Sequence, residues 1–144
     1  MSDQGYMQRA IDLARSQLGR TGVNPAVGCV IIAGERIVGE GATADGGSPH
    51  AEQIALDMAG EQARGATAYV TLEPCAQRSS GATACSGRLV EAGIVRVLVA
   101  CSDSSIMAAS QGLDRLRAAG IHVETGLLET EARGLYTDYQ PRQS

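Results

Sequence analysis

Short apolar runs alternate along this chain with segments of helical periodicity, and their order restricts the fold more than any other feature. Apolar runs of roughly four to eight residues indicate strands, whereas apolar residues three and four positions apart indicate helices. The order begins with a helix and two strands and then alternates between helix and strand up to a final helix. The predicted strands cover residues 27–32, 37–43, 66–72, 95–100 and 121–125, and the predicted helices cover residues 3–18, 49–63, 86–92, 113–119 and 129–139.

The connections between these segments predict how the strands pair. Residues 34–36 read Gly-Glu-Arg and fit a hairpin turn between the first two strands. Residues 89–94 and 116–121 resemble each other, since each combines a helix end, a capping glycine and the start of a strand. Two such units in succession favour parallel strands. We therefore predict a single domain over residues 1–144 with an α/β fold, a three-layer α/β/α sandwich around a five-stranded mixed sheet.

The composition narrows the class of protein. The chain has 144 residues, of which 44% are hydrophobic and 19% charged, and this suits one folded domain and excludes wholesale disorder. It contains no Trp, no Phe and only four Tyr, and its formal net charge is −4. A nucleic-acid binder is expected to have a basic face or aromatic stacking platforms, so we expect no nucleic-acid partner.

Neither a membrane span nor an export signal is evident. No apolar run is long enough to cross a bilayer, and the first four residues, Met-Ser-Asp-Gln, lack the charged-then-apolar pattern of a signal peptide. We therefore expect a cytoplasmic protein with no membrane partner. In that compartment the four cysteines are expected to be metal ligands or core residues rather than disulfide partners.

Residues able to bind a metal concentrate in two segments. The sequence Pro-His-Ala-Glu at residues 49–52 opens a predicted helix, and Glu-Pro-Cys at residues 73–75 follows a predicted strand. His50, Cys75 and Cys85 offer one imidazole and two thiolates, a donor set that suits Zn²⁺ and leaves a fourth tetrahedral position open for water. The order H-x-E and then P-C with a second cysteine is the signature of zinc deaminases, although the signature places two residues between the cysteines and this chain nine.

The carboxylate of this motif separates two classes of function. Glu52 stands two residues after His50 and need not bind the metal. Near an open coordination position it would take a proton from water and pass it to a ring nitrogen and then to a departing amine. A purely structural site has no use for such a carboxylate and normally fills its fourth position with a protein ligand. The alternative is a non-catalytic, zinc-stabilised module in which Cys29 or Cys101 approaches the metal.

The remaining thiols and the second histidine are interpreted as structural. Cys29 lies in the first predicted strand and Cys101 follows the fourth, where cysteine acts as a small hydrophobic residue. Core packing is also the alternative interpretation of Cys75 and Cys85. His122 alternates with apolar neighbours in the last strand and is expected to face solvent.

An asparagine next to a proline precedes the first strand. Asn24 offers both a donor and an acceptor to the edge of a heterocycle. Three of the four prolines adjoin candidate site residues, and rigid backbone is what a preorganised pocket needs. We interpret Asn24 as a substrate contact, and the alternative is a residue that only caps the loop.

These segments together give the chain a resemblance to the cytidine deaminase-like superfamily. Within it the chain is most similar to the deaminase domain of the bifunctional riboflavin-biosynthesis deaminase/reductases. The resemblance runs from about residue 3 to residue 135, and its matching stretches are residues 24–31, 50–52, 65–75, 89–94 and 112–121. The Thr-Leu-Glu-Pro-Cys block and the long gap between the two cysteines are specific to this branch.

The resemblance implies a Zn²⁺-dependent hydrolase. Such an enzyme removes an exocyclic amine from a pyrimidine-like small molecule, here the diaminohydroxyphosphoribosylaminopyrimidine of riboflavin biosynthesis. The resemblance implies that His50, Cys75 and Cys85 hold the zinc, that Glu52 moves the proton and that Asn24 contacts the ring. It also implies a homo-oligomer, and a reductase domain or partner outside this chain.

Two segments depart from the family pattern. The family loop usually reads like PCSHHGRTPPC, whereas residues 75–85 have one residue more and no histidine, with Gln77 where a family histidine stands. Arg78 offers a phosphate contact, or else it is a solvated arginine. Asp103 remains from the family's Asp-Pro-Asn-Pro segment, but Ser-Ser-Ile follows it. Because these positions are expected to contact the substrate, a free base or nucleoside of the cytosine, cytidine or guanine type is the alternative substrate.

Overall fold

The helices and strands follow the predicted order. The structure, a computed structural model, describes residues 2–22, 25–72, 85–101 and 111–136 of the chain. In these residues the helices are α1 (Asp3–Arg15), α2 (Ala51–Ala59), α3 (Cys85–Glu91), α4 (Gln111–Ala118) and α5 (Glu129–Arg133). The strands are β1 (Gly28–Ala33), β2 (Arg36–Ala42), β3 (Thr67–Leu72), β4 (Arg96–Cys101) and β5 (His122–Thr125). Short 3-10 turns are η1 (Asp45–Gly47), η2 (Gly60–Ala63) and η3 (Gly134–Tyr136).

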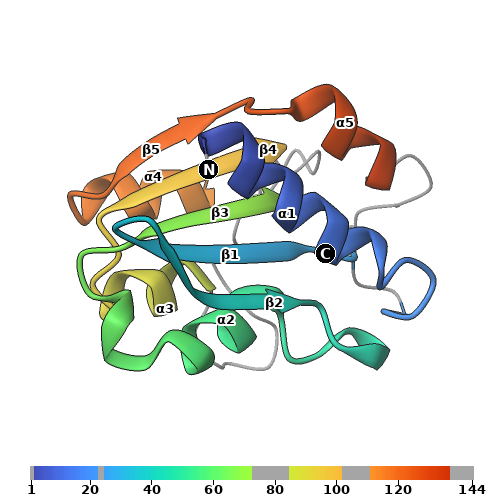
Figure 1. Ribbon diagram of the computed structural model, residues 1–144, viewed down its shortest axis with the longest axis horizontal. Coiled ribbons are helices and arrows are strands. Elements are labelled where there is room, and N and C mark those ends of the chain that lie inside the picture. The colour runs from blue at the N-terminus through green and yellow to red at the C-terminus, as the bar shows by residue number, and fades with distance from the viewer. Residues whose placement is uncertain (1, 23–24, 73–84, 102–110, 137–144) are drawn as a thin grey trace.

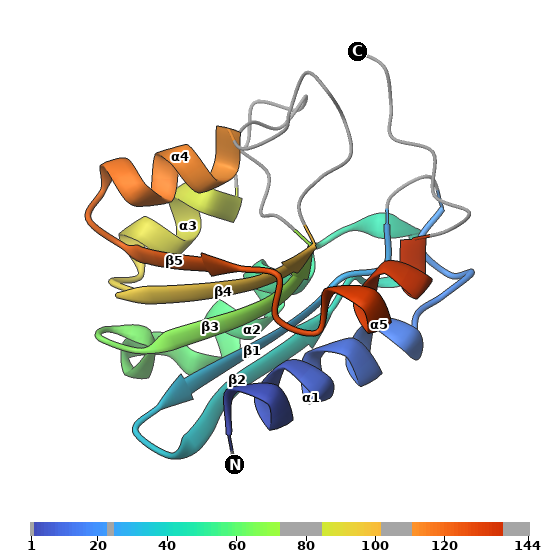
Figure 2. The same cartoon turned by 90° about the horizontal axis from the view of Figure 1, so that it is seen from above.

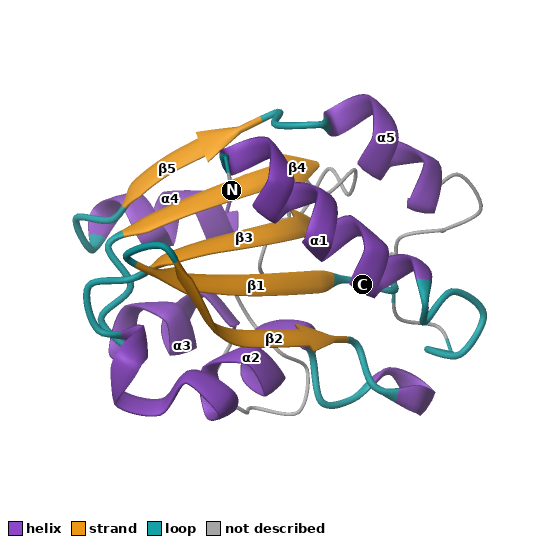
Figure 3. Ribbon diagram, viewed as in Figure 1, coloured by secondary structure: helices purple, strands orange, loops and turns teal. Residues whose placement is uncertain are grey.

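The described strands form one five-stranded sheet in the order β2-β1-β3-β4-β5 (Figure 3). β1 pairs antiparallel with β2 and with β3, and β3, β4 and β5 pair in parallel. The predicted hairpin and the predicted parallel pairing of the later strands are both confirmed. The sheet is therefore mixed, as the alternation of elements indicated.

Helices cover both faces of the sheet. α1 and α5 lie on one face, and α2, α3 and α4 lie on the other (Figures 1 and 2). This arrangement confirms the predicted three-layer α/β/α sandwich. Between the two helix layers, nearly all residues of β1, β3 and β4 are buried, as expected for strands that are covered on both faces.

The core consists of small aliphatic side chains. β1, β3 and β4 supply most of it through Val, Ile, Leu and Ala, and α1 adds a stripe at helical spacing. Cys29 and Cys101 are free thiols within this core, so their predicted role as small hydrophobic residues is confirmed. His122 is 68% exposed on β5, which confirms its predicted solvent-facing position.

Three predicted helices are longer than the observed ones: the first, the last, and the helix over residues 49–63, which is described with the site below. The first was expected to reach Leu18, but α1 ends at Arg15 and Gly19 adopts a φ of +82°, so Leu18 leaves the buried stripe and is 46% exposed. The last was expected over residues 129–139, but α5 ends at Arg133 and continues as η3, beyond which the chain lies outside the described residues. None of the helices in the described ranges has the length and apolar character that crossing a bilayer requires.

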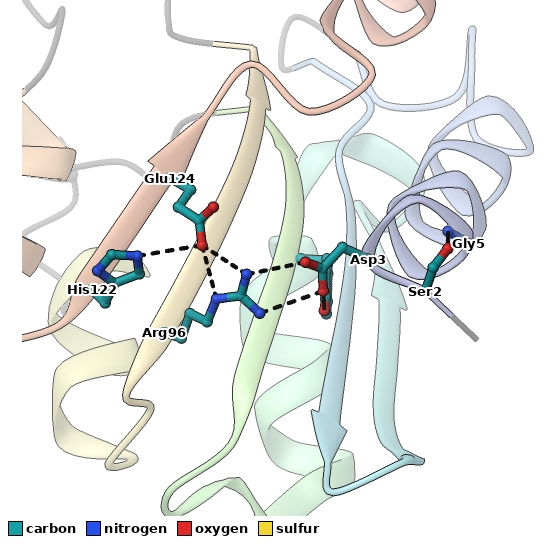
Figure 4. Close-up of polar contacts among 7 residues, drawn as sticks. Ser2, Asp3, Gly5, Arg96, His122 and Glu124 are labelled. Atoms are coloured by element: carbon teal, nitrogen blue, oxygen red, sulfur yellow. Dashed lines mark hydrogen bonds and ion pairs between the residues drawn. The ribbon is translucent and has the colours of Figure 1, made fainter.

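A charged cluster ties the start of α1 to the sheet at the end where β4 begins. Arg96 of β4 lies between Asp3 and Glu124, and its guanidinium nitrogens stand 3.1 Å from an Asp3 oxygen and 2.7 Å from a Glu124 oxygen (Figure 4). The Tyr69 hydroxyl also donates to Asp3. His122 stands 3.3 Å from Glu124 on the far side of the cluster. The cluster links one helix to three adjacent strands.

Candidate active site

One edge of the sheet brings together the chain segments that lead to the predicted site residues. β3 ends there at Leu72 and β4 at Cys101, and the antiparallel β1 begins there at Gly28 (Figure 1). In open α/β sheets, ligands bind at the carboxyl ends of the parallel strands. In the sequence, Asn24 precedes β1 and Cys75 follows β3. This edge is therefore the candidate site.

The first turn of α2 carries the two described residues of the predicted motif. His50 is the N-cap of α2, and its backbone is extended, with φ −74° and ψ 159°. Its carbonyl oxygen accepts a hydrogen bond from the Ile54 N–H at 3.2 Å. Glu52 lies in the first turn and is only 4% exposed. The motif thus begins at a helix entry, as predicted, and presents a buried carboxylate.

The predicted start of this helix is wrong by two residues. Ser48 was expected to be the N-cap and Pro49 the first helical residue. The Pro49 carbonyl instead accepts a hydrogen bond from the Ala44 N–H at 3.1 Å, which keeps Pro49 in the loop before the helix and leaves the N-cap position to His50. The helix also ends early, because Gly60 takes a φ of +56° and the following residues form η2.

Two glycines of β2 allow α2 to approach the sheet closely. A Cβ on Gly39 would stand 2.2 Å from the carbonyl oxygen of Ala55, and a Cβ on Gly41 would stand 2.6 Å from the carbonyl oxygen of Ala51. Both distances are far below van der Waals contact, so only glycine permits this approach. The position of the first turn of α2 over the sheet therefore depends on these two glycines.

A buried thiol lies close to the buried carboxylate. Gly28 faces α1, because a Cβ on it would meet Ala10, so the next residue of the strand, Cys29, faces the layer that contains α2. Complete burial raises the pKa of the Cys29 thiol well above its ordinary value, and the charge of Glu52 raises it further. Cys29 is therefore a buried core thiol on the side of the sheet that α2 covers.

Most of the predicted site residues fall outside the part of the chain that the structure describes. These residues are Asn24, Cys75, Gln77, Arg78 and Asp103, and the side chain of Cys85. The backbone of Cys85 begins α3, close to its predicted place at a helix start. Among the described side chains, no three His, Cys, Asp or Glu residues are grouped so that they could hold a metal. The structure therefore places His50 and Glu52 at the start of α2 and leaves the metal ligands as predictions.

The chemistry around these residues fits Zn²⁺. One imidazole with two thiolates is a donor set of catalytic zinc sites. The Ser86 hydroxyl, next to Cys85 in the chain, is fully buried and has no hydrogen-bond partner in the described ranges. An unsatisfied buried hydroxyl is costly, and groups next to metal ligands commonly act as their hydrogen-bond partners. A hydroxyl available beside Cys85 fits a site in which that residue is a thiolate ligand.

Three hydroxyl-bearing residues near this edge were not predicted from the sequence. Thr43, Thr71 and Tyr136 bind the backbone of residues 25–28, which lead into β1. Thr43 and Thr71 are 2% and 0% exposed. For the two threonines, the signal in the sequence is only their place at or near the end of a predicted strand, and that signal does not identify their partners.

Comparisons with known proteins agree with this geometry. Residues 1–101 match the family described as the cytidine and deoxycytidylate deaminase zinc-binding region. The riboflavin biosynthesis protein RibD of Escherichia coli is 46% identical over 142 residues, which are 99% of this chain and 38% of RibD. The solved structure of Acinetobacter baumannii RibD superposes with a TM-score of 0.91 at 47% identity and covers 95% of this chain and 38% of that one. This chain therefore spans well under half the length of these relatives.

A shorter relative matches over nearly its whole length. The diaminohydroxyphosphoribosylamino-pyrimidine deaminase of Buchnera aphidicola is 44% identical over 133 residues, which are 92% of this chain and 90% of that protein. Together with the match over residues 1–101, this shows that the chain belongs to the cytidine and deoxycytidylate deaminase family, the family defined by this zinc-binding region.

Proposed function

We propose that the chain is a zinc-dependent deaminase that hydrolyses the exocyclic amine of diaminohydroxyphosphoribosylaminopyrimidine. The observation that carries the proposal is the buried carboxylate of Glu52, two residues after His50, at the entry of α2. The Buchnera relative, which carries this substrate in its name, supports the choice of ring. The RibD relatives are named for the same pathway.

We assign the metal to three ligands, His50, Cys75 and Cys85. Zn²⁺ held by them would supply Lewis-acid activation of water near neutral pH. His50 contributes an imidazole from the N-cap position, and the close packing of α2 on β2 fixes its backbone. Two thiolates and one neutral imidazole also balance the charge of the metal.

Glu52 acts as the general acid and base. It takes a proton from the attacking water, which adds to the ring carbon that bears the amine, and delivers a proton to the adjacent ring nitrogen. Glu52 then takes the proton of the added hydroxyl and passes it to the amine, which leaves as ammonia while the ring carbon becomes a carbonyl. Burial of Glu52 at 4% exposure keeps competing water away from the carboxylate.

The substrate contacts belong to the segments around the sheet edge. We assign Asn24 to the ring, Arg78 to the phosphate, and Gln77 and Asp103 to the remaining polar groups of the substrate. These assignments rest on the family resemblance and on the chemistry of the side chains. Gln77, in place of a family histidine, is the residue by which the specificity of this chain would differ from that of its relatives.

The proposal also covers the domain organisation, the oligomeric state and the cellular compartment of the enzyme. Residues 1–144 act as one deaminase domain on a small molecule, with no nucleic acid as substrate, in a homo-oligomer. A reductase activity, in another domain or a partner, would consume the product, and the name of the solved Thermotoga maritima relative includes both activities. The free ligand thiols require a reducing compartment such as the cytoplasm.

Ammonia release by zinc-loaded protein tests the proposal. The ribosylamino phosphate is run beside cytidine, cytosine and guanine, with zinc-stripped protein as the control. We expect release from the phosphate alone, and only with zinc. Release only from another ring would show that the changed loop at residues 75–85 redirects specificity. No release from any of the four, with zinc bound, would contradict the assignment and favour the non-catalytic alternative.

A further inference from the structure

The residues that lead into β1 are held by side-chain hydroxyl groups in addition to one backbone bond next to the β1–β2 pairing. The Thr43 hydroxyl accepts from the Val27 N–H at 3.0 Å and donates to the Pro25 carbonyl at 3.2 Å. The Thr43 N–H donates to the Val27 carbonyl at 3.0 Å. Irregular backbone that is fixed in this way costs little to keep in one conformation once its polar groups are satisfied. The segment directly follows Asn24 in the chain.

Tyr136 and Thr71 complete this arrangement from the other side. The Gly28 N–H donates to the Thr71 hydroxyl at 3.0 Å, and the Tyr136 hydroxyl donates to the Ala26 carbonyl at 3.0 Å. The two hydroxyl oxygens are 2.8 Å apart. Because the single proton of Tyr136 goes to Ala26, Thr71 donates to Tyr136. The hydrogen bonds therefore run in one direction: Gly28 donates to Thr71, Thr71 donates to Tyr136, and Tyr136 donates to Ala26.

This chain of hydrogen bonds joins two strands at the edge where the site lies. Thr71 is the residue before the last in β3, the strand that precedes Cys75 in the sequence. Ala26 lies two residues after Asn24. Tyr136 belongs to η3, after α5 on the face of the sheet opposite α2 (Figure 2). The tyrosine thus holds the entry to β1 without belonging to the layer that carries His50 and Glu52.

We propose that Tyr136 is a positioning residue of the deaminase site, which sets the path of residues 25–28 and so the place from which Asn24 reaches the ring. This inference rests on the proposed function. Tyr136 acts through Thr71 and the backbone and does not touch the reacting atoms. Its removal is therefore expected to weaken substrate binding and to leave the metal and Glu52 as they are.

Tyr69 provides a matched control on the same face of the sheet. It is a buried tyrosine whose hydroxyl is also bonded, but its partner is Asp3, at the opposite end of β3 from Leu72. Tyr69→Phe removes the same hydroxyl group from a tyrosine that is buried, whereas Tyr136 is partly buried, so it controls for the loss of a bonded tyrosine hydroxyl elsewhere in the sheet. An effect of Tyr136→Phe that Tyr69→Phe does not reproduce is therefore specific to the position of Tyr136.

Steady-state kinetics of zinc-loaded protein gives the first test. Tyr136→Phe is expected to raise KM about tenfold and to leave kcat within about twofold. A displaced Asn24 would weaken the binding of the substrate and of the transition state equally, and such a loss raises KM without changing kcat. Tyr69→Phe is expected to leave both constants unchanged, and Thr71→Ser, which keeps the hydroxyl, to retain the wild-type KM. A fall in kcat with KM unchanged, or equal effects of the two tyrosine variants, would overturn the proposal.

A double-mutant cycle connects the effect to Asn24. If Tyr136 acts by positioning Asn24, Tyr136→Phe should raise KM by less than about twofold in a protein that already carries Asn24→Ala, because coupled residues are not additive. A full tenfold increase in that background would show that Tyr136 acts by another route.

Amide hydrogen exchange gives a readout that needs no turnover. In Tyr136→Phe the amides of Val27 and Gly28 should exchange at least about tenfold faster than in wild type, while Tyr69→Phe leaves them unchanged. Equal exchange in the two variants would overturn the positioning role. If the wild-type protein releases no ammonia from any ring, the proposed function fails, whereas the exchange of these two amides still decides whether Tyr136 holds the segment.

Discussion

Cys29 of β1 lies completely buried in the layer next to α2, near enough to Glu52 for that carboxylate to help raise the pKa of the thiol. Burial and the neighbouring carboxylate both favour the protonated thiol, as expected for a cysteine that packs in the core. This relationship separates a core thiol from the thiols that we assign to zinc. Whether Cys29 closes the site as a fourth protein ligand is tested by its substitution.

Substitution of the four cysteines should divide them into two pairs. Cys29→Ala and Cys101→Ala should keep one zinc per chain and the wild-type activity, with a loss of about 1 kcal/mol of stability from the smaller side chain. Cys75→Ser and Cys85→Ser should lose zinc and stability together, because metal binding is coupled to folding. Elemental analysis and denaturant unfolding measure both quantities.

A different result would contradict the ligand assignment for each pair of cysteines. Zinc loss in Cys29→Ala or Cys101→Ala would reveal a fourth protein ligand and favour a structural metal site. Stoichiometric zinc in Cys75→Ser or Cys85→Ser would show that the assigned ligand is wrong.

Gly41→Ala should disturb α2 and the site together. The new methyl group would stand 2.6 Å from the Ala51 carbonyl oxygen, so the first turn of α2 must move away from β2. Overpacking of this kind costs about 1–3 kcal/mol of stability. The displaced helix also carries His50 and Glu52, so activity should fall more than stability alone explains. Unfolding curves and kcat/KM at a temperature where the variant is fully folded separate the two effects.

A second glycine serves as the control for that substitution. Gly134 has a φ of −60°, and a Cβ on it would meet nothing within 4 Å. Gly134→Ala should therefore be neutral or slightly stabilising. A comparable loss of activity in both variants would mean that the close approach of α2 at Gly41 does not position the site.

The cluster around Arg96 should make stability depend on pH at the acid end. Hydrogen bonds from Arg96 and Tyr69 hold the pKa of Asp3 below its ordinary value. A lowered pKa in the folded state gives stability that is complete above the unfolded pKa, about 3.9, and is lost as pH falls through the folded pKa. Asp3→Asn should reduce the free energy of unfolding at pH 7 by up to about 1 kcal/mol, a modest amount because the pair is partly exposed.

The pH series identifies the cause of that loss. The difference between wild type and Asp3→Asn should shrink as pH falls below about 4 and through the lowered pKa of Asp3 in the folded state. Asp57→Asn, at an exposed position of α2, is the control. A difference that does not shrink even where titration of the folded protein shows Asp3 to be protonated would show that the charge of Asp3 does not contribute to stability.

The sequence predicted the layers and the sheet more completely than the site. Apolar periodicity reports burial, so the buried runs of β1, β3 and β4 and the glycine-capped ends at Gly93 and Gly120 were found from the residues alone. The N-cap of α2 was placed two residues early, because Ser48 and Pro49 have the local preferences of a helix start. A hydrogen bond from Ala44, which no local pattern contains, keeps Pro49 in the loop.

Residues of a local motif can be predicted from the sequence, whereas a residue that acts through a distant partner cannot. His50 and Glu52 were predicted as site residues because their spacing suits zinc chemistry. Tyr136 was missed because its role depends on Ala26, 110 positions away along the chain. Such pairings arise only once the chain has folded, and periodicity of the sequence does not record them.

Turnover by Glu52→Gln is the most direct test of the account. Zinc-loaded wild type and Glu52→Gln are compared for ammonia release from the ribosylamino phosphate, and zinc content is measured on the same samples. The amide keeps the shape of the side chain but cannot accept and return the proton. We predict one zinc per chain in both proteins and a loss of turnover of at least about a hundredfold in Glu52→Gln. Wild-type turnover in the zinc-loaded variant would remove Glu52 from the mechanism and contradict the account.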